Sequence, residues 1–182
     1  MSEVVQGLFS VPVNVVEKAF DKLGALKRLW LHEVMRVFSD RLINEDDKNL
    51  FVAECLSLED NRFFKKEELE DPAGIIFANF VDPGAHPPAY QEVTDMSRTK
   101  DALNVIIESF NDSHRTGPGK LDILLFDYMI QHLARVSRIL SKPFGNGLLV
   151  GLGGNGRKSI AKLASYINSC NMFEIVLHKN YG

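Results

Sequence analysis

The sequence predicts a mostly α-helical first part, residues 1–118, followed by a shorter α/β part, residues 119–182, that opens around a phosphate-binding loop. Three observations support this division. Several segments before residue 141 carry apolar residues at helical spacing. A glycine-rich turn at residues 151–156 stands between a short apolar run and another amphipathic segment. The stretch Thr-Gly-Pro-Gly-Lys, residues 116–120, has the composition of a linker, so the boundary is placed there.

Composition indicates a globular chain. Its 182 residues are 45% hydrophobic and 25% charged, which is close to the average for globular domains. The formal net charge of -3 provides no electropositive field, so no nucleic-acid partner is expected. Cys55 and Cys170 are expected to be buried small apolar residues in a reducing compartment and not a disulfide. The sequence shows neither a secretory leader nor an apolar run long enough for a membrane helix, so we expect an intracellular chain without a membrane partner.

Two helices are expected early in the chain. The first lies within residues 14–43, with Gly24 interrupting or starting its strongest part. Apolar residues that recur every three or four positions there should share one face; they are Leu26, Trp30, Val34, Val37, Phe38 and Leu42. The second helix should be capped by Asn44 and carry acidic residues in its first turn. Its expected apolar stripe consists of Leu50, Phe51, Cys55 and Leu56.

An extended segment and a third helix complete the predicted first part. Residues 75–81 form an apolar run that predicts a strand or a buried extended segment. Residues 82–88 contain three prolines and a glycine and therefore predict a loop. Residues 101–111 predict an amphipathic helix whose inward side chains are Leu103, Ile106, Ile107 and Phe110.

The second part alternates predicted helices and strands. Residues 122–140 predict a helix with a continuous apolar stripe, formed by Leu125, Phe126, Met129, Ile130, Leu133, Val136 and Leu140. Residues 148–150 predict a short buried strand, and residues 173–177 a second one. Between them, residues 158–168 predict a helix with Ile160, Leu163, Ala164 and Ile167 inward.

The glycine-rich turn partly matches the phosphate-loop pattern G-x-x-x-x-G-K-S/T. Gly151 and Gly156 occupy the two glycine positions, but Arg157 stands in place of the lysine and Lys158 in place of the metal-binding hydroxyl. Ser159 comes one position late, which weakens magnesium coordination unless its hydroxyl reaches the metal. Backbone N–H groups and the following helix can still cradle a phosphate. The predicted phosphate-binding residues are Gly151, Gly153, Gly154, Asn155, Gly156, Arg157, Lys158 and Ser159.

Two other interpretations of the turn remain open. Gly151, Gly153 and Gly156 also fit the dinucleotide-binding pattern G-x-G-x-x-G, with Glu174 at roughly the distance of a ribose-binding acid. Glu174 lies near the start of its predicted strand, however, whereas the ribose-binding acid belongs near the end. The turn can also be a tight strand-to-helix connection that binds no ligand.

No catalytic or metal-ligating group is predicted. His32 and Glu33 begin an H-E-x-x-H pattern, but Arg36 stands where the second histidine should be, so a zinc site is rejected. The remaining histidines share no ligand spacing, and no nucleophile with a histidine base can be proposed. Trp30 is most simply a core side chain.

The chain resembles a known family at several places in family order. Residues 28–42, Arg-Leu-Trp-Leu-His-Glu-Val-Met-Arg-Val-Phe-Ser-Asp-Arg-Leu, are similar to the R-L-W-x-H-E-x-x-R-V-F-x-D-R-L pattern of dynein heavy chains. In that family the pattern lies in the helical lid of the third AAA+ module of the motor ring. Residues 124–140 resemble the helix that opens the fourth module, and residues 151–159 resemble its phosphate loop, G-V-G-G-S-G-R-Q-S in axonemal dyneins. Residues 179–182 match the family's K-N-Y-G.

The resemblance implies a mostly α-helical lid, residues 1–118, followed by an incomplete α/β P-loop (AAA+) segment, residues 119–182. Arg157 favours the axonemal type, because cytoplasmic dynein resembles the lysine form at this position. Asn155, Lys158 and Ile160 depart from the usual serine, glutamine and leucine. The resemblance also makes Arg28 a candidate lid sensor of the nucleotide in its own module; a surface salt bridge is the alternative for this arginine.

The resemblance suggests a function and its partners. The family is an ATP-driven, minus-end-directed microtubule motor, so ATP or ADP with Mg²⁺ is expected only in the full-length context. The expected partners are the rest of the motor ring and other dynein subunits. Microtubules would be contacted through parts absent here. The expected location is the cytoskeleton and the ciliary axoneme. Neither a Walker B acid nor a sensor is found, so the chain alone is expected to lack ATPase activity and to couple ring modules. The alternative is a stand-alone, non-enzymatic binding or structural module that keeps the loop only as a turn.

Overall fold

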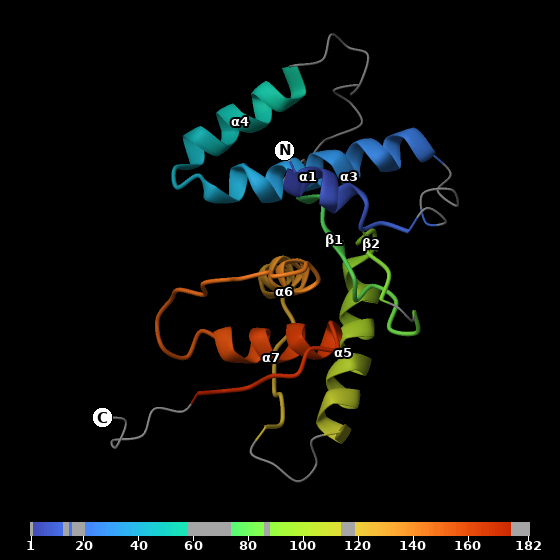
Figure 1. Cartoon of the computed structure of the whole chain (residues 1–182), viewed down its shortest axis with the longest axis vertical. Coiled ribbons are helices and arrows are strands. Elements are labelled where there is room, and N and C mark those ends of the chain that lie inside the picture. Colours follow the sequence, from blue (N-terminus) through green and yellow to red (C-terminus); the bar gives the residue numbers. More distant parts are fainter. Residues whose placement is uncertain are drawn as a thin grey trace. The chain divides into compact units, whose positions relative to one another are not determined.

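The computed structural model of the chain describes residues 2–12, 15, 21–57, 74–85, 88–113 and 119–175 (Figure 1). Packing divides the chain into two compact units, Met1–Leu103 and Asn104–Gly182. This division falls inside a helix, whereas the predicted domain boundary follows residue 118. That boundary stays a prediction, and the predicted linker residues 116–118 lie outside the described residues.

The described residues of the first unit form several helices and one small sheet. These elements are α1 (Ser2–Leu8), α3 (Lys22–Val37), the 3-10 helix η1 (Ser39–Arg41), α4 (Glu45–Ser57), β1 (Phe77–Ala78) and β2 (Gln91–Glu92). The helix α5 (Met96–Ser113) begins in this unit. Within the described part of the chain, no helix is both long and apolar enough to span a membrane.

Helix α3 begins where a side chain caps it. Asp21 has extended backbone angles, and its carboxylate accepts a hydrogen bond from the amide of Gly24 at 3.0 Å. This bond satisfies one of the amides that a helix leaves without an internal partner. The helix predicted within residues 14–43 is thereby confirmed over Lys22–Val37, and Gly24 lies in its first turn. Residues 14 and 16–20 of that prediction lie outside the described residues.

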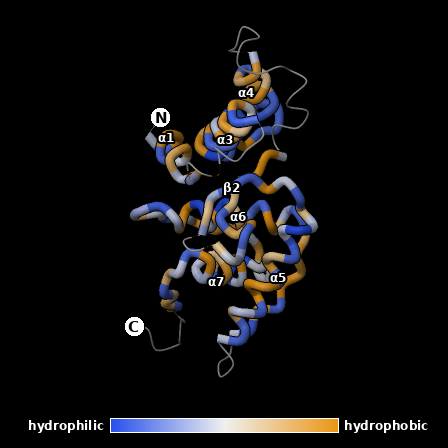
Figure 2. Tube along the Cα trace, turned by 90° about the vertical axis from the view of Figure 1, so that its right-hand side faces the viewer, coloured by the Kyte–Doolittle hydropathy of each residue, from blue (hydrophilic) through white to orange (hydrophobic). Residues whose placement is uncertain are grey.

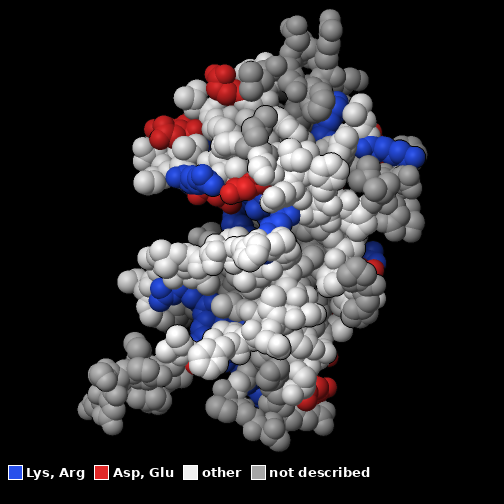
Figure 3. All heavy atoms as spheres, viewed as in Figure 1, with Lys and Arg blue, Asp and Glu red and all other residues white. Residues whose placement is uncertain are grey.

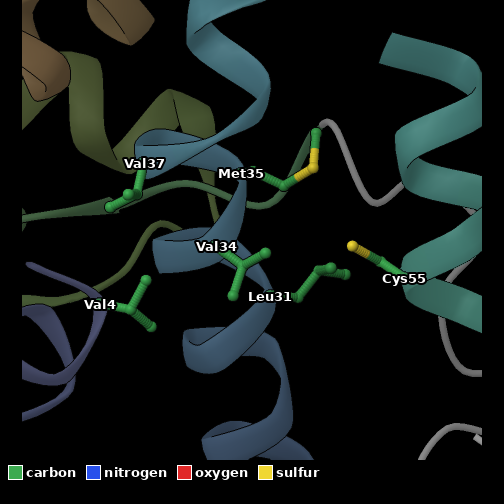
Figure 4. Close-up of a cluster of buried hydrophobic side chains, with 6 residues drawn as sticks. All are labelled: Val4, Leu31, Val34, Met35, Val37 and Cys55. Carbon is green, nitrogen blue, oxygen red and sulfur yellow. The ribbon is translucent and has the colours of Figure 1, made fainter. Parts of the chain in front are cut away.

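Helix α3 is packed on more than one side. One cluster of buried side chains joins it to α1 and α4, and in Figure 4 the side chains of Leu31 and Cys55 point toward each other. The members are Val4, Leu31, Val34, Met35, Val37 and Cys55. A second cluster joins Leu29 to Phe77 and Tyr90 near the small sheet. The predicted single face is therefore partly wrong. Leu26 and Phe38 are exposed, whereas Leu29 and Leu31 lie among the most buried residues of the helix.

Helix α4 confirms the predicted second helix. Glu45, Asp46 and Asp47 occupy its first turn, where their charges favour the positive end of the helix dipole. Cys55 is buried, and Phe51 and Leu56 pack partly buried against the first cluster. The prediction was wrong for Leu50, whose side chain is 61% exposed.

The small sheet consists of two antiparallel strands. β1 pairs with β2 so that Phe77 faces Glu92 and Ala78 faces Gln91. Ile76, Phe77, Ala78 and Phe80 are all buried, which confirms the buried extended segment predicted over residues 75–81. Residues 86 and 87 of the predicted loop lie outside the described residues.

Helix α5 begins five residues earlier than the sequence predicted. Asp95 caps it by accepting hydrogen bonds from the amides of Ser97 at 2.9 Å and Arg98 at 3.1 Å. Leu103, Ile107 and Phe110 are buried as predicted.

The second unit contains a pair of packed helices, α6 (Asp127–Leu140) and α7 (Arg157–Ile167). Apolar and polar residues alternate along both helices in the hydropathy view (Figure 2). The buried apolar side chains of the pair are Met129, Ile130, Leu133, Ala134, Leu163, Ala164 and Ile167. Asn168, just after α7, donates a hydrogen bond to the hydroxyl of the buried Ser137 on α6 at 2.8 Å. The predicted helix over residues 158–168 is confirmed within one residue. Cys170, which was predicted to be buried, is exposed in the segment after α7.

Three predicted elements of this unit differ from the structure. The helix predicted from residue 122 starts at Asp127. Residues 121–126 are not helical, and the side chain of Asn111 forms hydrogen bonds with both the amide and the carbonyl of Leu121. The strand predicted over residues 148–150 is absent, and these residues are exposed. Of the strand predicted over residues 173–177, residues 173–175 are also exposed and form no strand, and residues 176 and 177 lie outside the described part. A strand needs a neighbouring strand for its backbone hydrogen bonds, and none lies beside these segments among the described residues.

Candidate phosphate-binding loop

The glycine loop, residues 151–156, connects an extended segment to the first turn of α7. Gly154 and Gly156 have φ angles of 85° and 71°, in the left-handed region that favours glycine. Gly156 is also the residue that caps α7. The sequence therefore has glycine at the two positions where the backbone of the turn requires it. As a result, the N-terminus of α7 faces the space beside the loop.

A cavity of about 500 Å³ lies against this loop. Six of the eight predicted phosphate-binding residues line it, with Leu149 as a further member that the sequence did not indicate; the six are Gly154, Asn155, Gly156, Arg157, Lys158 and Ser159. Gly151 and Gly153 are not part of its lining. Lys and Arg side chains gather on the face of the second unit where the loop leads into α7 (Figure 3). The cavity is thus bordered by backbone amides and basic side chains, which is the donor set that an anion requires.

The start of α7 adds unpaired amide groups to the cavity. The first bond within this end of the helix runs from the amide of Ile160 to the carbonyl of Gly156 at 2.9 Å. The amides of Arg157, Lys158 and Ser159 precede that bond and belong to the turn that a helix cannot satisfy internally. The helix dipole places partial positive charge at the same end. Both effects favour an anion such as a phosphate group in the cavity.

Arg157 bends back over the loop. Its guanidinium donates hydrogen bonds to the carbonyl of Leu152 at 3.0 Å and to that of Leu149 at 3.4 Å. A Cβ at Gly151 would lie 3.6 Å from this side chain, an ordinary van der Waals contact, so the position of Arg157 does not require glycine there. The guanidinium therefore joins the two sides of the turn while its charge stays beside the cavity.

Lys158 forms an ion pair with Glu174. The hydrogen bond from Lys158 lowers the pKa of the Glu174 carboxyl below its ordinary value, and the charges of Lys158 and Lys162 act in the same direction. Glu174, the acid that the dinucleotide interpretation assigned to a ribose, is bound to a lysine of the loop instead. Ser159 is half-buried in the first turn of α7 and lines the cavity.

Arg28, the candidate lid sensor, belongs to the first unit. Its Nε lies 2.9 Å from Oε1 and 3.1 Å from Oε2 of Glu92 on β2, so the guanidinium bridges both carboxylate oxygens. The ion pair ties α3 to the small sheet. The sensor role stays a prediction, and the salt bridge that was its alternative is present.

A buried polar chain next to Arg28 was missed by sequence reasoning. His32 Nδ1 lies 2.9 Å from the carbonyl of Ile75, and His32 Nε2 lies 2.9 Å from the hydroxyl of Tyr90. That hydroxyl donates to Oε1 of Glu33 at 3.0 Å. The adjacent His32 and Glu33 were the available signal, but they were considered only as the start of a zinc motif. Among the described residues, no group of three acidic, histidine or cysteine side chains has the geometry of a metal site.

The fold and the loop define a class of protein. A helical unit followed by a glycine loop on the N-terminus of a packed helix is the arrangement of an AAA+ lid joined to the start of a P-loop module. Comparison with known families agrees. Residues 1–74 match the AAA+ lid domain, and residues 121–182 match the P-loop containing dynein motor region D4.

Individual relatives extend the match over the whole chain. The chain is 38% identical to dynein axonemal heavy chain 1 of Mus musculus, 34% identical to dynein axonemal heavy chain 17 of Homo sapiens and 36% identical to the ciliary dynein beta chain of Tripneustes gratilla. Each alignment covers 100% of this chain and 4% of the relative. The chain belongs to the dynein heavy chain family, and these relatives are of the axonemal and ciliary type.

Proposed function

We propose that the glycine loop binds the phosphate groups of a nucleotide, ATP or ADP, and reports their presence to the helices packed behind it. The observation that supports this most strongly is the combination of two left-handed glycines with a cavity of about 500 Å³ at the start of α7. Backbone amides supply most of the contacts, and Arg157 supplies charge-assisted hydrogen bonds. A bound phosphate competes with the carbonyls of Leu149 and Leu152 for the Arg157 guanidinium.

The proposed binding is coupled to α6 through the packing of the second unit. Residues 157–159 form both the wall of the cavity and the first turn of α7. The other end of α7 is fastened to α6 by the hydrogen bond from Asn168 to Ser137. A shift at the start of α7 therefore reaches α6 through a continuous helix and a buried contact. In this proposal the loop is a sensor of phosphate and performs no catalysis.

The chain spans about 4% of the length of the relatives it matches. For the whole protein we propose the role of an ATP-driven, minus-end-directed microtubule motor of cilia and flagella, located in the axoneme. Within it, this segment would couple neighbouring AAA+ modules of the motor ring, with residues 1–118 as the lid of the third module and residues 119–182 as the start of the fourth. Its partners would be the rest of the ring and other dynein subunits. The names of the axonemal and ciliary relatives support this proposal.

The loop proposal is tested by titrating the ¹⁵N-labelled chain with ADP and recording amide chemical shifts. We expect selective shifts at residues 154–159, because these residues line the cavity. We expect weak binding, because Leu149 is the one apolar side chain in the described lining and offers the nucleotide base little contact. Adenosine, which lacks phosphates, should leave these amides unmoved. Arg157→Ala should weaken ADP binding, whereas Arg98→Ala, which removes the same charge from an exposed position on α5, should not. Equal shifts with ADP and adenosine would contradict the proposal.

A further inference from the structure

The side chains around the cavity do not suit the metal ion that usually accompanies a nucleotide at a phosphate loop. In the standard loop, a serine or threonine hydroxyl directly after the lysine binds Mg²⁺. Here that position is held by Lys158, which lines the cavity and pairs with Glu174. An ammonium group has three donors and no lone pair, so it cannot ligate a cation. It also repels one.

The charge balance around the cavity points the same way. Two side-chain cations, Arg157 and Lys158, line it together with the positive end of the α7 dipole. Among the residues that the structure describes, the carboxylate paired with this set is that of Glu174, and Lys158 already neutralises it. Ser159 also borders the cavity, but it stands one position later than the metal-binding hydroxyl of the standard loop. The charge that this surface complements is a bare polyphosphate, which carries more negative charge than its magnesium complex.

We propose that the loop binds the polyphosphate of a nucleotide without a divalent metal ion, and that Lys158 replaces the metal as the neutralising charge. The proposal rests on the proposed phosphate-binding function of the same loop. On binding, the ammonium exchanges the Glu174 carboxylate for phosphate oxygens, so Glu174 is the internal competitor of the ligand. Lys158 is the residue that determines the metal-free specificity.

The test compares ADP titrations of the ¹⁵N-labelled chain in excess EDTA and in excess MgCl₂ at matched ionic strength. In the parent chain, we expect affinity in EDTA to equal or exceed that in MgCl₂. Lys158→Ser restores a hydroxyl at the metal position and should reverse this preference. It should weaken binding of metal-free ADP about fivefold, the effect of one unit charge at contact distance in water, and make binding tighter with Mg²⁺. Arg98→Ser removes a charge from an exposed position on α5 and should behave like the parent.

The outcomes separate the two proposals. Loop shifts that require Mg²⁺ in the parent chain would overturn the metal-free proposal and leave phosphate binding standing. A Lys158→Ser chain that keeps the parent's preference for EDTA would overturn the assignment to Lys158. Absence of loop shifts under both conditions would overturn phosphate binding itself and the metal-free proposal with it. Glu174→Gln provides an independent readout, because release of Lys158 from its partner should strengthen ADP binding in EDTA.

Discussion

Replacing Gly7 with alanine should destabilise the first unit, although alanine normally stabilises a helix. Gly7 lies in α1 directly over the buried Glu33 of α3. A Cβ at this position would lie 1.7 Å from Glu33 Oε2 and 2.0 Å from Glu33 Cδ. Glu33 is fully buried, and its other oxygen accepts the hydrogen bond from Tyr90. Its carboxylate therefore has no solvent to move into, and either the network or the docking of α1 must give way.

The magnitude follows from opposing contributions. Helix propensity favours alanine over glycine by up to about 1 kcal/mol. Disturbing a buried hydrogen bond to a charged group costs about 1.5–3 kcal/mol. Overpacking costs about 1–3 kcal/mol more. The sum predicts that Gly7→Ala lowers the free energy of unfolding by about 1.5–5 kcal/mol.

Gly24→Ala is the matched control. A Cβ there would lie 1.9 Å from Asp21 Oδ2, a similarly close approach, but Asp21 is exposed and can turn into water. The lost cap of about 1 kcal/mol is offset by the propensity gain, so the net effect should stay within about 0.5 kcal/mol. Urea unfolding followed by circular dichroism measures both variants, and amide exchange at Val4 reports whether α1 stays docked. A Gly7→Ala chain as stable as the parent would refute the reasoning.

Three further predictions concern the loop and the buried network. Gly156→Ala should lower the free energy of unfolding by roughly 1–2 kcal/mol, because alanine is strained at this left-handed φ, and it should reduce the amide shifts that ADP induces. Gly153→Ala, at a position with open space for a Cβ, should change neither quantity by much. An equal loss of ADP-induced shifts in both variants would contradict this. The pKa of the Glu174 carboxyl should lie below its ordinary value of 4.5, so the ion pair with Lys158 is fully formed above about pH 4.5 and is lost as the pH falls through the lowered pKa. Carboxyl ¹³C chemical shifts measure this pKa. Lys158→Ala should return it toward the ordinary value. Tyr90→Phe should lower unfolding free energy by about 1–3 kcal/mol, because two buried groups lose a hydroxyl partner; a urea midpoint unchanged from the parent would count against it.

Apart from α1, which was not predicted, the existence of the helices was predictable from apolar spacing, but helix ends were set by contacts that spacing does not encode. α5 starts at the Asp95 cap, five residues before its apolar pattern was recognised. α6 starts at Asp127, after a segment in which Asn111 binds both the amide and the carbonyl of Leu121. That pairing joins residues on either side of the predicted linker. The prediction that the buried residues of α3 share one face was wrong for a related reason. A helix that is packed on two sides also buries residues outside the predicted apolar stripe, such as Leu29.

The candidate site could be predicted in its backbone but not in its side chains. Glycine spacing indicated the loop, because a left-handed turn before a helix demands glycine at particular positions. The sequence also showed that Arg157 and Lys158 replace the standard residues. It could not show that Arg157 binds the carbonyls of its own loop or that Lys158 reaches Glu174. Those contacts depend on where the segment after α7 returns, and that is a property of the folded unit.

The chain from Ile75 through His32 and Tyr90 to Glu33 joins three separate segments of the first unit by directional bonds. The carbonyl of Ile75 can only accept, so the hydrogen of that bond is carried by His32 Nδ1. The Tyr90 hydroxyl contacts both His32 Nε2 and Glu33 Oε1, so a single side chain before β2 holds two neighbouring residues of α3. Because a hydrogen bond depends on direction as well as distance, this chain fixes the rotation of α3 about its own axis, which apolar packing alone leaves less constrained.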